Sequence, residues 1–197
     1  MSLVQSCIPE TQTVAPLLKF SFIPGSRTLS CFFHSRQQGR LKNNAELIVK
    51  TCASEISTIT VGESGVIPVK QLRENTITSL DLSNKGLGVD GALILAALIK
   101  DNTSVQQLHA QNNGLGPEGA KYFGSMLEHN NTLTLLDVSG NQMKAKGAAA
   151  LAGGLKANTG VQQLNASSNS LGPEGAMALA ASIAENSTIT SVRTLFL

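Results

Sequence analysis

Four polar residues recur at a fixed interval in the second half of the chain, and three of them have side chains that could do chemistry. Asp81, His109 and Asp137 are 28 residues apart, and Asn165 follows at the same interval. If this spacing places them side by side, an imidazole stands between two carboxylates, an arrangement that could bind a metal ion weakly or exchange protons. An open surface lacks the burial that tunes catalytic pKa values. We therefore expect a polar surface for contacting another protein, with no catalytic, cofactor or metal-binding residues.

The interval belongs to a repeated unit of 28 residues that occurs four times without insertion. Apolar residues at positions 4 and 6 of each unit alternate with polar ones, as in a short strand with one buried face. These pairs are Leu80/Leu82, Leu108/Ala110, Leu136/Val138 and Leu164/Ala166. Positions 3, 5 and 7 then face outward, and neighbouring strands are about 5 Å apart. The sequence therefore predicts that position 5 forms a column across the strands.

Leu135 is the one large apolar residue among these outward positions in the four complete units. A leucine surrounded by polar groups is a plausible anchor for a partner. The candidate protein-binding residues are therefore Asp81, His109, Leu135, Asp137 and Asn165.

The rest of each unit predicts a turn and then a helix. Position 9 holds Asn113, Asn141 and Asn169, whose amides can satisfy buried peptide groups where the chain leaves the strand. The first unit has Lys85 there, which predicts an irregular or solvated turn. Pro-Glu pairs open two of the expected helices, and small residues at position 20 favour close helix packing. Asparagines close the helices, which favours a structural use of these N-x-S/T matches over glycosylation.

A unit of this kind, with Leu-Gly-Pro-Glu-Gly-Ala opening the helix and Asn-Thr or Asn-Ser-Thr closing it, resembles the leucine-rich repeat of the ribonuclease-inhibitor type. That type also occurs in NOD-like receptors and Ran GTPase-activating proteins. The resemblance covers residues 77 to about 192. It implies an α/β solenoid with parallel strands on the concave face, helices on the convex face, four full repeats and a partial fifth. These relatives share a scaffold and differ in what they bind.

Charge and cysteine usage exclude several classes of function. The four complete repeats hold six Lys and Arg against eight Asp and Glu, so no basic stripe for nucleic acid exists in them. A Walker loop, a Cys-x-x-Cys pair and a His-Glu-x-x-His motif are all absent, so no cofactor is expected. All three cysteines precede the repeats, which argues against a disulfide-stabilised secreted horseshoe.

Residues 1–52 have a different composition, and we expect a transit peptide or a disordered tail. Up to Lys42 the segment is basic and rich in hydroxyl groups, with Glu10 its one acid, as in organelle transit peptides. Its apolar pieces are too interrupted for a membrane span. A loose processing motif at residues 49–53 favours the chloroplast, with the mitochondrion or cytoplasm as alternatives. Residues 53–76 would then cap the solenoid, whose end otherwise exposes its core.

The repeat pattern fails after Val192, and residues 193–197 form an irregular end. We expect this end to leave Leu164, Leu171, Leu179 and Ile183 uncovered, as in a truncated or alternatively spliced array, and to favour self-association. The function we expect is a non-enzymatic scaffold whose concave face binds a protein. The alternatives are a regulator of a small GTPase, of the GTPase-activating type, and a structural subunit of an organelle assembly.

Overall fold

The computed structural model describes residues 19–22, 28–32, 56–62 and 64–194. It contains a four-stranded sheet near the N-terminus and a five-stranded sheet in the repeat region. Within these residues, no helix is long and apolar enough to cross a membrane.

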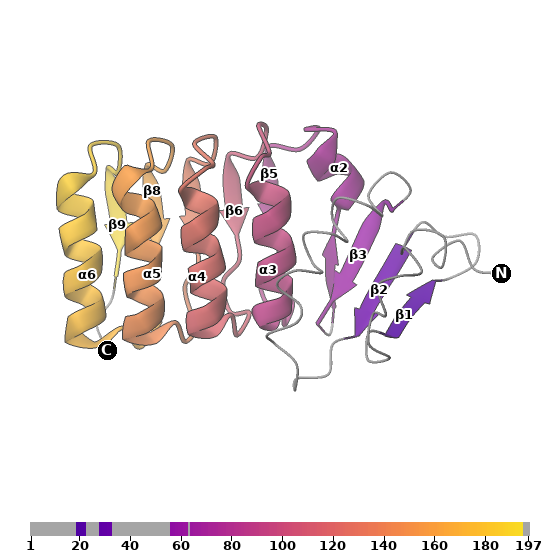
Figure 1. Ribbon diagram of the computed structural model, residues 1–197, viewed down its shortest axis with the longest axis horizontal. Helices are drawn as coiled ribbons and strands as arrows, with labels where there is room; N and C mark the ends of the chain where they lie inside the picture. Colours follow the sequence, from indigo (N-terminus) through magenta and orange to yellow (C-terminus); the bar gives the residue numbers. More distant parts are fainter. Residues whose placement is uncertain (1–18, 23–27, 33–55, 63, 195–197) are drawn as a thin grey trace, which may run out of the picture.

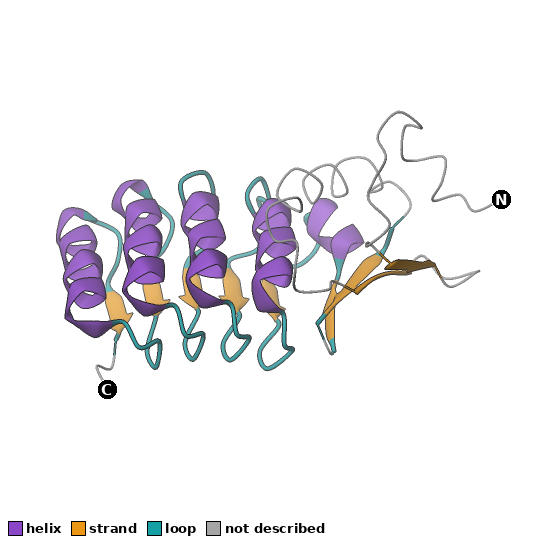
Figure 2. Ribbon diagram, turned by 60° about the horizontal axis from the view of Figure 1, so that its bottom comes forward, coloured by secondary structure: helices purple, strands orange, loops and turns teal. Residues whose placement is uncertain are grey.

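The repeat region is a two-layer solenoid. Its strands pair in parallel in sequence order, and its helices lie side by side in a row along one side of the sheet (Figures 1 and 2). The strands are β5 (Ser79–Asp81), β6 (Gln107–His109), β7 (Leu135–Asp137), β8 (Gln163–Asn165) and β9 (Ser191–Arg193). The helices are α3 (Gly88–Ile99), α4 (Gly116–Leu127), α5 (Lys144–Ala157) and α6 (Gly172–Glu185). The predicted α/β solenoid is confirmed, and β9 is the strand of the partial fifth repeat.

The core lies between the two layers and uses the strand positions that the alternation predicted. Leu108, Leu136 and Leu164 at position 4 are at most 2% exposed. Position 6 is buried in all four complete repeats, whether it carries Leu82 or the small Ala110. Fully burying a leucine is worth about 1.5–3 kcal/mol. The outward side of the sheet, which faces away from the helices, is therefore the concave face, and its side chains are those of positions 3, 5 and 7.

Glycines allow α4 and α5 to approach closely. A Cβ added to Gly154 would lie 2.1 Å from the carbonyl oxygen of Gly124, and one added to Gly124 would lie 2.3 Å from that of Ala150. Either side chain would push the helices apart, because non-bonded carbon and oxygen atoms do not approach so closely. The expectation of close helix packing at position 20 is confirmed for Gly124.

Asparagines at position 9 satisfy the turns as predicted. Asn141 is fully buried, and its Nδ2 donates to the carbonyl oxygens of Ala110, Val138 and Ser139 at 2.9 to 3.1 Å. The expectation of an irregular first turn is wrong. Asn113 of the second repeat accepts hydrogen bonds from the amides of Lys85 and Leu87. Asn141 accepts the same two bonds in the next turn, so the first turn is held as the others are.

A second row of asparagines joins the helix ends. Asn130 donates from Nδ2 to the carbonyl oxygens of Ile99 and Asn102, and its Oδ1 accepts from the amide of Leu133. Asn158 and Asn186 make equivalent bonds to the preceding repeat. Asn130 is 2% exposed, so this side chain is structural, as the sequence predicted.

The segment before the repeats packs against the first of them. The N-terminal sheet has the order β1-β2-β3-β4, and β2 pairs with β3 in parallel. Its strands are β1 (Lys19–Phe22), β2 (Thr28–Phe32), β3 (Thr58–Val61) and β4 (Gly65–Ile67), and helix α2 (Val69–Arg73) follows. β1 and β2 lie within residues 1–52, whose assignment as a separate segment stays a prediction. The expected processing motif at residues 49–53 lies outside the described residues.

The capping segment, residues 53–76, contributes β3, β4 and α2 to the cover over the first repeat. Ile59, Val69 and Leu72 are at most 1% exposed and belong to the same apolar core as the repeats. Gly62 has a φ of +63°, and a Cβ there would lie 1.9 Å from the carbonyl oxygen of Gly86 in the first turn. Only glycine allows this contact, so the two turns are packed together.

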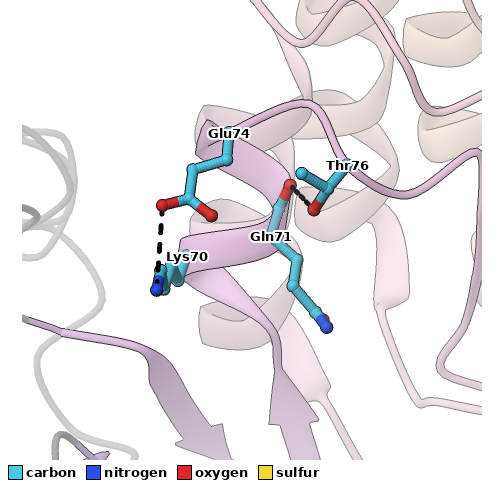
Figure 3. A network of polar contacts seen from close by, with 4 residues as sticks. All are labelled: Lys70, Gln71, Glu74 and Thr76. Atoms are coloured by element: carbon cyan, nitrogen blue, oxygen red, sulfur yellow. Dashed lines mark hydrogen bonds and ion pairs between the residues drawn. The ribbon is translucent and has the colours of Figure 1, made fainter.

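Polar contacts hold the end of α2. Lys70 and Glu74 form an exposed ion pair of 3.9 Å, and the hydroxyl of Thr76 donates to the carbonyl oxygen of Gln71 at 3.2 Å (Figure 3). An exposed pair of this kind contributes little stability. The apolar contacts of Val69 and Leu72 therefore hold the helix in place.

The C-terminal end differs from the expectation of an uncovered core. Leu164, Leu171 and Leu179 are 2%, 6% and 1% exposed, so that expectation is wrong for these residues. β9 accounts for part of the cover, because Val192 pairs beside Leu164 and packs against the core. Ile183 is partly buried against the core. Met177 is the large apolar side chain of α6 that is exposed.

Candidate protein-binding face

The parallel register assembles the position-5 column. Asp81 lies opposite His109, His109 opposite Asp137, and Asp137 opposite Asn165. The column continues to Arg193, which lies opposite Asn165 and which the sequence analysis missed. Its interval from Asn165 is the same as that of the other members, so the spacing could have identified it.

Serines at position 7 hold three members of the column in place. Asp137 Oδ1 accepts hydrogen bonds from the amide of Ser139 at 3.0 Å and from its hydroxyl at 2.7 Å. Asp81 makes the same two bonds with Ser83. The hydroxyl of Ser167 donates to Asn165 Oδ1 at 2.8 Å in the same way. An acidic or amide side chain two residues before a serine is the local signal, and the sequence analysis did not use it.

The two carboxylates differ in their remaining contacts. Asn165 Nδ2 donates to Asp137 Oδ2 at 2.8 Å, so both oxygens of Asp137 are engaged. Asp81 is exposed, and its hydrogen bonds with the described residues both use Oδ1. The side-chain and backbone hydrogen bonds from Ser83 lower the pKa of Asp81, with smaller contributions from the charges of His109 and Lys85 and an opposing effect of burial. Asp81 therefore stays ionised at neutral pH.

The second repeat lacks this internal bond. It carries His109 at position 5 and Gln111 at position 7, and both side chains are half-buried. Gln111 Oε1 is buried and is the buried side-chain atom without a hydrogen-bond partner among the described residues. A buried unsatisfied polar atom costs about 1–3 kcal/mol. The polar groups of β6 are thus the least satisfied part of the column.

Leu135 lies on the concave face as predicted, but its side chain is partly buried. It lies beside Gln107 and Gln163 on the neighbouring strands. The amide side chains of these two residues are exposed. Leu135 is therefore an apolar spot within a polar surface.

The column offers little for catalysis. Among the described residues, no three His, Cys, Asp or Glu side chains lie close enough together to hold a metal ion. Asp81 and Asp137 lie on strands separated by β6, so a spacing of about 10 Å separates their backbones. The arrangement is better suited to several separate polar contacts than to one reactive centre.

Comparison with known proteins agrees with this architecture. A family model described as "Leucine Rich repeat" matches residues 101–124, 129–152 and 157–180. The chain thus contains leucine-rich repeats. Its strand-turn-helix units of 28 residues resemble those of the ribonuclease-inhibitor type. No curated protein matches the chain in sequence.

Solved structures share the leucine-rich repeat fold. "Leiomodin-1 Actin-Binding Site 2" superposes with a TM-score of 0.60 at 21% identity, covering 64% of this chain and 76% of that one. The tropomodulin C-terminal domain of Caenorhabditis elegans superposes with a TM-score of 0.56 at 18% identity, covering 64% of this chain and 80% of that one. At such identities the likeness shows the fold alone.

Proposed function

We propose that this protein is a non-enzymatic scaffold that binds a protein partner on the concave face. The observation that carries the proposal is the position-5 column, in which Ser83, Ser139 and Ser167 fix the neighbouring Asp81, Asp137 and Asn165. Side chains fixed before binding lose less conformational freedom when a partner arrives. Leu135 supplies an apolar contact within the same surface.

The solved relatives support a binding role without identifying the partner. The leiomodin structure is named for an actin-binding site, so that protein uses this architecture to contact another protein. The low identity gives no reason to expect the same partner for this chain. The absence of a buried, reactive cluster in the position-5 column favours binding over catalysis.

We further propose that the protein is imported into the chloroplast. The basic, hydroxyl-rich composition of residues 1–42 supports this proposal, as it does for transit peptides generally. The partner would then be a protein of the stroma.

Affinity capture tests the proposal. The immobilised chain would be incubated with stromal extract, and retained proteins would be identified by mass spectrometry. We expect a retained protein that an excess of the free chain displaces. Retention that the free chain does not reduce would contradict specific binding.

A GTP-hydrolysis assay with any captured GTPase separates the scaffold from a GTPase-activating protein, because a passive binder does not stimulate turnover at catalytic amounts. Co-purification in a large stromal complex would instead favour a structural subunit.

A second candidate is self-association through α6. Met177 is 64% exposed on this helix, and an exposed large apolar side chain favours contact with another apolar surface. Light scattering tests it. We expect the wild-type chain to have a mass above that of one chain, and we expect Met177→Glu to lower this mass. A wild-type chain that is monomeric at all concentrations would contradict the candidate.

A further inference from the structure

We infer that the part of the concave face centred on β6 binds a cationic side chain, lysine or arginine, from a segment of the protein partner. The inference rests on the proposed function and names the chemistry of the partner. Its basis is the set of acceptor groups that β5, β6 and β7 present together.

Charge on this part of the face has one sign. The outward positions 3, 5 and 7 of the four complete repeats carry two acidic side chains, Asp81 and Asp137, and no lysine or arginine. Arg193 is four strands from Asp81, or about 19 Å along the sheet. Lys85 in the first turn is close enough to act on the charge of Asp81 but lies beyond the outward strand positions. A partner group above β6 therefore meets two carboxylates from neighbouring strands.

Unused acceptors surround the same point. Asp81 Oδ2 has no hydrogen-bond donor among the described residues. Gln111 Oε1, two residues beyond His109, also has none. The other repeats have a serine at position 7 that bonds back to position 5, whereas β6 has no such bond. Two acceptors near β6, Asp81 Oδ2 and the buried Gln111 Oε1, thus have no donor, and the exposed amide of Gln107 lies on the same strand.

A cationic side chain supplies what is missing. An ammonium group has three donors and a guanidinium has five, and neither has an acceptor. Bonds from such a group to a carboxylate are among the stronger hydrogen bonds in proteins. Rotation of the terminal amide of Gln111 would let its orphaned oxygen accept one of them. Phosphate or an acidic peptide would instead meet two like charges, so the partner segment is basic.

The first test uses a defined probe. The full-length chain, labelled with ¹⁵N, would be titrated with the peptide Gly-Ser-Gly-Arg-Gly-Ser-Gly and followed by NMR. The matched peptide carries citrulline, which keeps the shape of arginine and removes its charge. We expect saturable shifts at His109 and Gln111 with the arginine peptide and binding weaker by about tenfold or more with citrulline. Equal responses, or arginine-dependent shifts confined to the helices, would overturn the inference.

The second test removes the two charges. Asp81→Asn and Asp137→Asn together remove the charges and preserve the side-chain shape. The fold accepts asparagine at this position of the repeat, because Asn165 in the fourth repeat bonds to Ser167 as Asp137 bonds to Ser139. We expect this double variant to bind the arginine peptide about tenfold more weakly. Asp101→Asn, an exposed site after α3, is the control and should bind unchanged. Unchanged binding by the double variant would overturn the inference.

The same variants separate the two proposals. If Leu135→Glu abolishes capture of the stromal partner while the double variant captures it normally, the cationic contact is wrong and the concave-face function stands. If no partner is captured but the arginine peptide binds at β6, the cationic contact stands and the proposed function fails.

Discussion

The backbone amide of Asn113 donates to the side-chain oxygen of Asn141 in the next repeat, 2.8 Å away. Asn141 repeats this bond to Asn169, so each asparagine satisfies its own turn and the preceding one. Repeats of this fold are stabilised by their neighbours rather than individually. This contact is therefore part of what makes the stack cooperative.

Replacing Asn141 tests that role. Asn141→Ala would leave the buried amides of Asn113 and Leu115 without their acceptor, whereas the carbonyl oxygens of Ala110 and Val138 would each keep a second donor. Each buried unsatisfied group costs about 1–3 kcal/mol, so we expect a loss of about 3 kcal/mol or more in the free energy of unfolding. Asn131→Ala is the control, because Asn131 is exposed and accepts one bond, from the amide of Thr159. Urea denaturation measures both, and equal losses would contradict the role of Asn141.

The assigned strand faces are tested by a second pair of variants. Leu136 is fully buried, so Leu136→Ala should destabilise the fold by about 2–5 kcal/mol. His109 is half-buried on the concave face, and its side chain makes no hydrogen bond with the described residues, so His109→Ala should change the free energy of unfolding by no more than about 0.5 kcal/mol. Comparable destabilisation of the two variants in urea would mean that the faces are assigned wrongly.

Asp90 gives a prediction about pH. It is half-buried in the first turn of α3, and burial raises its pKa above the ordinary value of 3.8. A raised pKa means that the folded state binds the proton more tightly than the unfolded state does. The free energy of unfolding therefore falls as the pH rises above 3.8 and through the raised pKa, because the buried carboxylate becomes ionised. Asp90→Asn should therefore raise the melting temperature at pH 7.

The advantage of Asp90→Asn should disappear below pH 3.8, where the wild-type side chain is neutral in both states. The favourable effect of a negative charge at a helix N-terminus works against this gain, but the upward pKa shift indicates that burial outweighs it. Thermal melts from pH 3 to pH 7 measure the difference. A lower melting temperature for the variant at pH 7 would contradict the assignment.

Localisation is tested with fluorescent fusions. A fusion of residues 1–60 should enter plastids if the N-terminal segment is a transit peptide, and residues 53–197 alone should stay in the cytosol. Mitochondrial signal would redirect the search for a partner to that organelle. Diffuse cytosolic signal from the first fusion would remove the basis for the chloroplast proposal.

Much of the architecture was predictable because its signals are local or periodic. Leu136 and Asn141 repeat at the same positions of successive units, and each position has one physical role. The contact of Gly62 with Gly86 was not predictable, because it joins two turns of different origin and no period relates them. The cover over Leu164 was missed because β9, the strand of the partial fifth repeat, was expected to contribute too little.

Part of the candidate face was likewise predictable from the sequence, and part was not. The column of Asp81, His109 and Asp137 follows directly from the interval and the parallel register. The unsatisfied oxygen of Gln111 could not be inferred, because it depends on the side-chain arrangement around one atom. The half-buried state of Leu135 likewise depends on how its neighbours on β6 and β8 pack around it.

The central claim is that a protein partner binds the concave face. The measurement that tests it most directly compares how much of the stromal partner is captured by Leu135→Glu and by the wild-type chain. Met177→Glu, which places the same charge at an exposed apolar site on α6, is the matched control. We expect Leu135→Glu to lose capture with its fold intact by circular dichroism and Met177→Glu to retain it. Normal capture by Leu135→Glu together with loss in Met177→Glu would contradict the claim and place the interface on the helices.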